Sequence, residues 1–87
     1  MPALPTLFSM LNQLIEIPSV SSTQASIDQS NLPVIERLAE WLEVIGFTTE
    51  IVPIETPVGS PEKANLIATL GSGPGGLVLS GHTDTVP

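Results

Sequence analysis

The hydrophobic period changes halfway along this 87-residue chain, and that change most constrains its fold. Up to Ile45 the apolar residues recur at helical spacing, whereas after Gly46 they alternate with polar residues or form short apolar runs. This order predicts two helices followed by three strands. Because no internal repeat is visible, we expect a single α/β domain over residues 1–87.

Two amphipathic helices are predicted in the first half of the chain. The first covers about residues 4–16 and stops before Pro18. Its apolar stripe consists of Leu4, Leu7, Phe8, Leu11, Leu14 and Ile15. The second begins at Ser30 or Asn31, which can cap it, and ends at Gly46 in a left-handed conformation. Its predicted core face consists of Ile35, Leu38, Leu42 and Ile45.

Three short strands are predicted at residues 47–52, 64–70 and 77–80. The first alternates apolar and polar residues, and a loop rich in Pro and Gly, starting at Pro53, separates it from the second. The third is mostly apolar, which is typical of a strand buried in a parallel sheet. We therefore expect the third strand to lie inside a larger sheet.

The glycines at residues 71–76 match the pattern G-x-G-x-x-G, which is found in dinucleotide-binding loops. Such a loop needs a helix directly after the glycines, so that the free N–H groups of the helix meet the pyrophosphate. Here a strand is predicted instead, and Pro74 removes one N–H donor. We interpret these residues as a hairpin-like connection between strands.

The charge balance argues against several classes of function. Nine acidic residues against Arg37 and Lys63 give a net charge of −7, so the chain lacks the cations that nucleic acids and anionic membranes attract. The sequence has no recognisable signal peptide or membrane span, and it has no cysteine, which fits a reducing compartment. We expect a cytoplasmic protein that binds neither nucleic acid nor membrane.

Residues 81–87, with the sequence G-H-T-D-T-V-P, contain the candidate site. In an extended strand His82 and Asp84 face the same side, so the imidazole can bind a metal while the carboxylate holds its other ring nitrogen. A solvated surface pair would have the same pattern. A triad with Ser80 is disfavoured, because the spacing of about 6.5 Å along a strand exceeds hydrogen-bond reach. Since zinc sites take about three protein ligands, one histidine cannot complete a metal site.

Residues 75–87 resemble the first signature of the M20 metallopeptidase and deacylase family. The resemblance continues upstream, in order and spacing, through residues 28–31, 38–41, 46–47 and 63–65. It implies a three-layer α/β/α domain of the zinc-exopeptidase type. Residues 1–87 would be the N-terminal part of that catalytic domain, without its lid and dimerisation domain.

The resemblance also implies a chemistry, namely hydrolysis of a linear amide with the help of two zinc or cobalt ions. His82 would be a metal ligand, and Asp84 would serve catalysis by orienting the imidazole. The match within the family implies an N-acyl amino acid substrate, N2-acetyl-L-ornithine, cleaved to ornithine and acetate in arginine biosynthesis. Because the other family ligands and the glutamate base are missing, we expect the 87-residue chain alone to be inactive.

Two alternatives stay open at this point. A related family member could act on succinyl-diaminopimelate, another N-acyl amino acid or a dipeptide. A chain that had kept the fold without catalysis would be an acidic interaction module. Because the rest of the larger sheet is missing, the third strand would leave an open sheet edge, which predicts self-association or strand swapping of the isolated chain.

Overall fold

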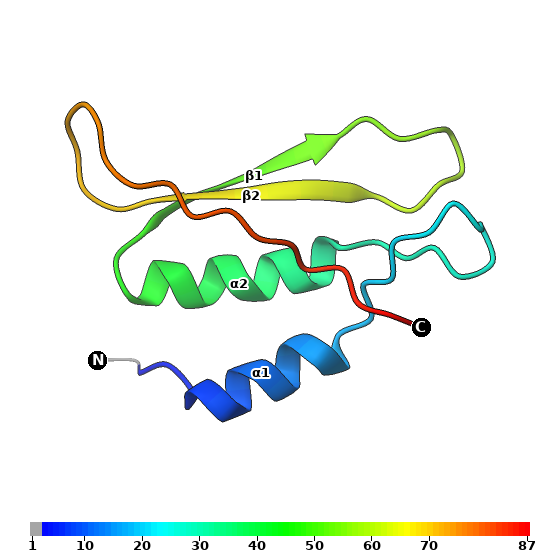
Figure 1. The fold of residues 1–87 in the computed structure, drawn as a ribbon, viewed down its shortest axis with the longest axis horizontal. Coiled ribbons are helices and arrows are strands. Elements are labelled where there is room, and N and C mark those ends of the chain that lie inside the picture. The colour runs from blue at the N-terminus through cyan, green and yellow to red at the C-terminus, as the bar shows by residue number, and fades with distance from the viewer. Residues whose placement is uncertain (1–2) are drawn as a thin grey trace.

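The computed structural model describes residues 3–87, which form two helices, a two-stranded sheet and a long C-terminal segment (Figure 1). The elements are α1 (Leu7–Glu16), α2 (Leu32–Val44), β1 (Thr48–Ile54) and β2 (Lys63–Thr69). The two strands are antiparallel, with Thr48 opposite Thr69 and Ile54 opposite Lys63. The predicted α/β class is therefore confirmed, in partial form.

Helix α1 begins at Leu7, three residues later than predicted, because Thr6 caps it. The Ser9 N–H donates a hydrogen bond of 3.1 Å to the Thr6 hydroxyl, which satisfies one of the free amides of the first turn. The helix ends at Glu16, two residues before Pro18, as predicted. Neither α1 nor α2, the helices of residues 3–87, is long and apolar enough to cross a membrane.

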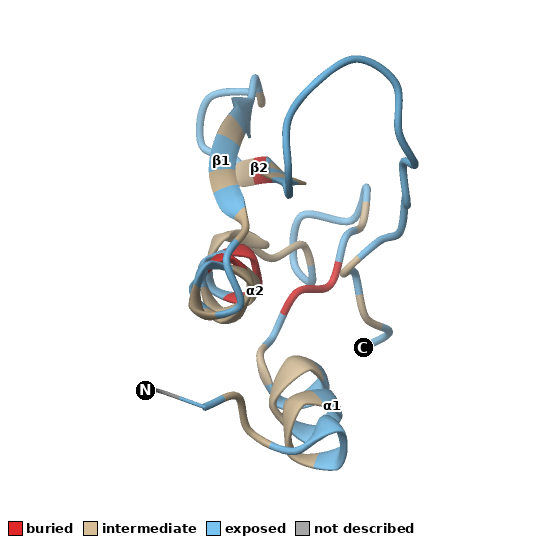
Figure 2. Ribbon diagram, turned by 90° about the vertical axis from the view of Figure 1, so that its left-hand side faces the viewer, coloured by how far each residue is buried: buried red, intermediate tan, exposed pale blue. Residues whose placement is uncertain are grey.

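The apolar stripe of α1 is largely uncovered. Its Leu7, Phe8 and Ile15 side chains are 70%, 76% and 70% exposed. Figures 1 and 2 show α1 beyond α2, on the side away from the sheet. The helix therefore forms as its sequence predicts, but most of its stripe does not join the core of the described residues.

Helix α2 packs on both strands and supplies most of the small core. The buried hydrophobic residues are Val20, Val34, Ile35, Ala39 and Ala64 (Figure 2). The predicted core face is therefore right for Ile35, whereas Leu38 and Leu42 are half-buried and Ile45 is 50% exposed. Ile45 is the C-cap residue, at which the chain leaves the helix axis.

The end of α2 follows the prediction for Gly46, which has φ of 100°. The Phe47 N–H donates to the Leu42 carbonyl at 3.0 Å, and the Gly46 N–H donates to the Glu43 carbonyl at 3.1 Å. These two bonds form a Schellman motif, which satisfies carbonyls that the helix would leave free. The turn directs the chain straight into β1.

Strand β1 runs through Pro53 to Ile54, two residues further than predicted. Pro53 lies opposite Ala64, whose backbone N–H and C=O are both bonded at 2.8 Å to the Asn31 side chain. These backbone groups of Ala64 therefore point away from β1, and Pro53 belongs to a pair that needs no N–H donor. A proline is tolerated at such a position, which the sequence pattern alone could not reveal.

The predicted third strand at residues 77–80 is wrong for this structure. These residues lie outside any strand, and Leu77, Val78 and Leu79 are 86%, 89% and 87% exposed. A buried parallel strand needs hydrogen-bonding neighbours, and within residues 3–87 the sheet contains only β1 and β2, so no strand is paired with this segment. The glycine-rich loop carries the chain away from the end of β2 before it returns (Figure 2), so it connects a strand to an unpaired segment.

Candidate functional site

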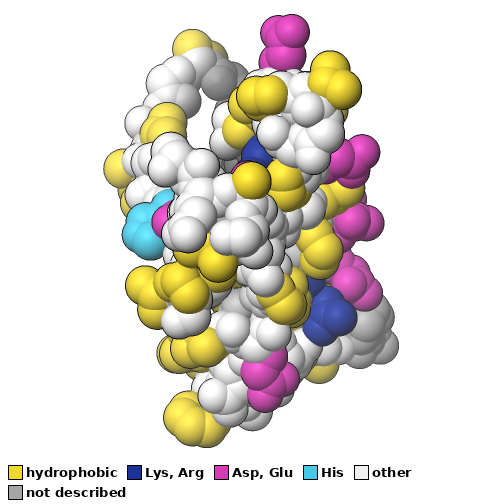
Figure 3. Space-filling view, turned by 90° about the vertical axis from the view of Figure 1, so that its right-hand side faces the viewer, with side chains coloured by type: hydrophobic (Ala, Val, Ile, Leu, Met, Phe, Trp, Pro, Cys, Tyr) yellow, Lys and Arg dark blue, Asp and Glu magenta, His cyan; other side chains and the backbone are white. Residues whose placement is uncertain are grey.

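His82 and Asp84 lie in direct contact near the end of the chain. His82 Nδ1 is 2.8 Å from Asp84 Oδ1, and the two side chains are 82% and 53% exposed. Figure 3 shows the histidine standing out from the surface with an acidic side chain against it. Because the carboxylate holds Nδ1, the proton is assigned to that nitrogen, which leaves the lone pair on Nε2. This is the geometry of an oriented metal ligand.

The backbone around this pair is held by Ser19, a residue of the loop between α1 and α2. The Ser19 hydroxyl donates to the Thr83 carbonyl at 2.7 Å, and the Thr85 N–H donates to the Ser19 carbonyl at 3.3 Å. Val20 and Thr85 also form an isolated parallel bridge. Sequence reasoning assigned this loop no role, and no local pattern reveals it, because the bonded partners are 64 residues apart.

A polar network ties the same loop to the start of β2. Lys63 Nζ lies 2.8 Å from Asp28 Oδ1 and also donates to the Gln29 carbonyl. Gln29 is bonded to Val20 in both directions: its side-chain carbonyl accepts from the Val20 N–H, and its own N–H donates to the Val20 carbonyl, each at 2.8 Å. The hydrogen bond from Lys63, helped by one from the Ser22 N–H, lowers the pKa of Asp28 below the ordinary aspartate value.

Asn31 forms a second link between this loop and the sheet, through its two bonds to the Ala64 backbone. Since its side chain is engaged there, it makes no capping bond to α2. The Ser30 hydroxyl instead accepts from the Leu32 N–H at 3.1 Å. The two residues predicted to cap α2 therefore have different roles: Ser30 accepts from the first turn of the helix, and Asn31 links the loop to β2.

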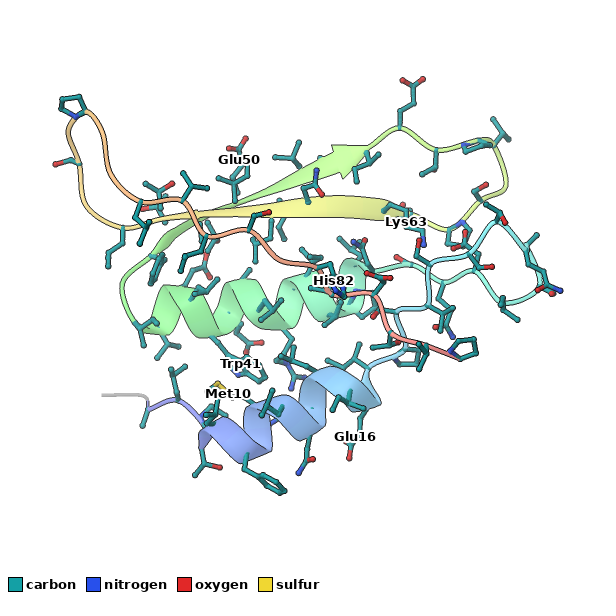
Figure 4. All side chains as sticks on the ribbon, viewed as in Figure 1. Met10, Glu16, Trp41, Glu50, Lys63 and His82 are labelled. Carbon is teal, nitrogen blue, oxygen red and sulfur yellow. The ribbon has the colours of Figure 1, made fainter. Side chains whose placement is uncertain are left out.

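A groove of about 740 Å³ lies between β2 and the segment that carries His82. Asn31 and residues 63–67 line one side, and residues 79–84 line the other. Figure 4 shows His82 on the extended segment and Lys63 at the start of β2. The candidate ligand therefore borders this groove, which is larger than a second hollow of about 190 Å³ beside the start of β2.

The donor set around His82 is small. Within residues 3–87, no three His, Asp or Glu side chains come close enough together to hold a metal ion. The imidazole nitrogen suits zinc or cobalt, and its carboxylate partner supplies the second contact that such ligands usually have. The residues present therefore fit one side of a metal site.

The partial α/β fold and the paired His82 and Asp84 are the features that the M20 resemblance implied. The chain is similar to acetylornithine deacetylases of Photorhabdus laumondii (56% identical over 84 residues), Proteus mirabilis (56% over 84) and Pasteurella multocida (51% over 87). These matches cover 97%, 97% and 100% of the chain. No protein-family model matches it.

These matches confirm the resemblance read from residues 75–87: the chain is similar to acetylornithine deacetylases over nearly its whole length. The chain spans about a fifth of the length of these curated relatives, 21% to 22% of each.

Proposed function

We propose that this chain supplies one arm of the active site of a metal-dependent deacetylase that hydrolyses N2-acetyl-L-ornithine. The identity of 56% to two proteins named acetylornithine deacetylase carries this proposal. The same names favour acetylornithine over the alternative substrates, succinyl-diaminopimelate and dipeptides. The absence of cysteine supports a cytoplasmic location as part of the proposal.

In this proposal His82 binds a zinc or cobalt ion through Nε2, and Asp84 keeps the imidazole in the required tautomer and direction. A bound metal of this kind supplies polarisation of the acyl carbonyl and a lower pKa for water. Because a catalytic zinc takes about three protein ligands, His82 provides only one of those needed. We therefore propose that the 87-residue chain alone does not hydrolyse acetylornithine.

The test uses Co²⁺ as a paramagnetic probe of the ¹⁵N-labelled 87-residue chain. We expect NMR line broadening centred on His82, its loss in His82→Ala, and an affinity about tenfold lower in Asp84→Asn, because partners of a ligand tune its metal binding. Glu55→Gln, which changes an exposed acid on the loop after β1, is the matched control and should leave the broadening unchanged.

Broadening that persists in His82→Ala would show that the metal binds elsewhere and would refute the assigned ligand. A second assay addresses the activity of the chain alone. Chelator-sensitive release of acetate from acetylornithine by the purified chain would contradict the single-arm proposal.

A further inference from the structure

Ser19 is a polar residue in a loop, and yet it is almost completely buried. It is 1% exposed, and it is the buried polar residue of the part of the chain that the structure describes. A buried hydroxyl has to be hydrogen-bonded, and this one donates to the Thr83 carbonyl at 2.7 Å. The carbonyl that it meets belongs to the residue between His82 and Asp84.

We propose that Ser19 is a positioning residue for the His82–Asp84 arm; this inference rests on the proposed metal role of His82. The Thr83 carbonyl belongs to the peptide group before Asp84, and the Thr85 N–H belongs to the peptide group after it. Ser19 bonds both, through its hydroxyl and its carbonyl respectively. The two peptide groups that flank Asp84 are therefore fixed by one residue, and with them the direction of the Asp84 carboxylate.

The rest of the segment offers little other support. Residues 71–82 are exposed throughout, and the predicted strand that would have held residues 77–80 is not formed. A ligand held in its binding geometry loses less conformational freedom when the metal binds, so its support raises affinity. Ser19 is the residue that gives this exposed segment its fixed point.

Ser19 is itself fixed to the sheet. Its neighbour Val20 is 8% exposed and forms two hydrogen bonds with Gln29. The Gln29 carbonyl accepts a hydrogen bond from Lys63 at the start of β2. The segment that carries His82 is thereby connected to β2 through three consecutive contacts, namely Thr83 to Ser19, Val20 to Gln29, and Gln29 to Lys63. A substitution at Ser19 interrupts this connection without touching the imidazole.

The test compares Ser19→Thr with Ser19→Val in the 87-residue chain, because these two side chains have the same shape and differ by one hydroxyl. We expect the Val variant to bind Co²⁺ at His82 about fivefold more weakly than the Thr variant, and its Thr85 amide to exchange faster. Ser19→Ala should behave like Ser19→Val, and Ser21→Ala, at an exposed serine of the same loop, should match the unmodified chain.

Equal Co²⁺ affinity and equal Thr85 exchange in the Thr and Val variants would overturn the inference. An equal loss of protection at Thr85 and throughout α2 in the Val variant would also overturn it, because that result indicates a general structural role. If no variant binds Co²⁺ at His82, the metal proposal fails by itself. Thr85 exchange and the tautomer of His82, read from its ring ¹⁵N shifts at pH 8, then decide whether Ser19 positions the arm.

Discussion

The contact between Lys63 and Asp28 makes the loop that supports the site sensitive to acid. The two side chains are 17% and 15% exposed and lie 2.8 Å apart. Lys63 lowers the pKa of Asp28 in the folded chain. The stabilisation is therefore complete above the unfolded-state pKa, which is about 3.9 for aspartate, and is lost as the pH falls through the lower folded-state value.

We expect the free energy of unfolding to fall on acidification below about pH 4, and to fall less in Asp28→Asn or Lys63→Met. Urea unfolding at a series of pH values measures this. Glu62→Gln, at an exposed acid next to Lys63, is the control and should keep the acid dependence of the unmodified chain. The same pH profile in Asp28→Asn and in the unmodified chain would show that this carboxylate does not contribute.

For individual residues, the sequence predicts only contacts between close neighbours in the chain. The pairing of His82 with Asp84 follows from a spacing of two residues, and the pair of Arg37 with Glu40, 3.7 Å apart, follows from helical spacing. The bond of Ser19 to Thr83 joins residues 64 apart, so its pattern cannot be seen without the fold. The support of the site is thus less predictable than its motif.

Among the elements, helix α2 ends where Gly46 adopts a left-handed conformation. A Cβ placed on Gly46 would meet only Leu70 Cδ1, at 4.0 Å, so no clash opposes a larger residue. The φ of 100° is the obstacle, because side chains with a Cβ rarely adopt it.

We therefore expect Gly46→Ala to lower the free energy of unfolding by about 1–2 kcal/mol. Gly81→Ala is the matched control: its Cβ would meet nothing within 4 Å and its φ is not positive, so its effect should be near zero. Chemical denaturation of both variants measures the difference. Equal stability of the two would show that the Schellman turn does not depend on glycine.

Helix ends are determined by residues close in sequence, whereas strands also need partners that are distant in sequence. Thr6, Pro18 and Gly46 each act within a few residues, and each lies where its helix begins or ends. The strand predicted at residues 77–80 needed a neighbour, and its apolar side chains could not supply one. Pro53 also depends on a distant partner: it is tolerated in β1 because it lies opposite Ala64, in a pair without hydrogen bonds between the two strands.

In the whole molecule, one long stretch of the chain is uncharged and carries exposed apolar side chains. Residues 64–81 contain no charged side chain, although the chain carries a net charge of −7. This uncharged stretch includes β2 and the exposed Leu77, Val78 and Leu79. The backbone groups of Leu66 and Ala68 point to the open edge of β2, as those of Ala64 do, because alternate residues of an antiparallel strand face the same way.

We propose that two copies of the chain associate through this stretch, the residues 77–80 of one copy adding to the open edge of β2 of the other. Two uncharged segments can approach without the repulsion that the acidic surface elsewhere would cause, and an unpaired edge beside an exposed apolar run favours strand addition. The groove next to β2, about 740 Å³ in volume, leaves that edge accessible.

Light scattering should show a mass that rises with concentration, and Val78→Lys should shift the chain towards the monomer, because a charge on the added strand opposes pairing. Val58→Lys is the matched control, since Val58 is fully exposed on the loop between β1 and β2 and lies outside the uncharged stretch. A monomer at every concentration would contradict the proposal. If Phe8→Lys, on the exposed stripe of α1, abolished association while Val78→Lys did not, the interface would instead be the α1 stripe.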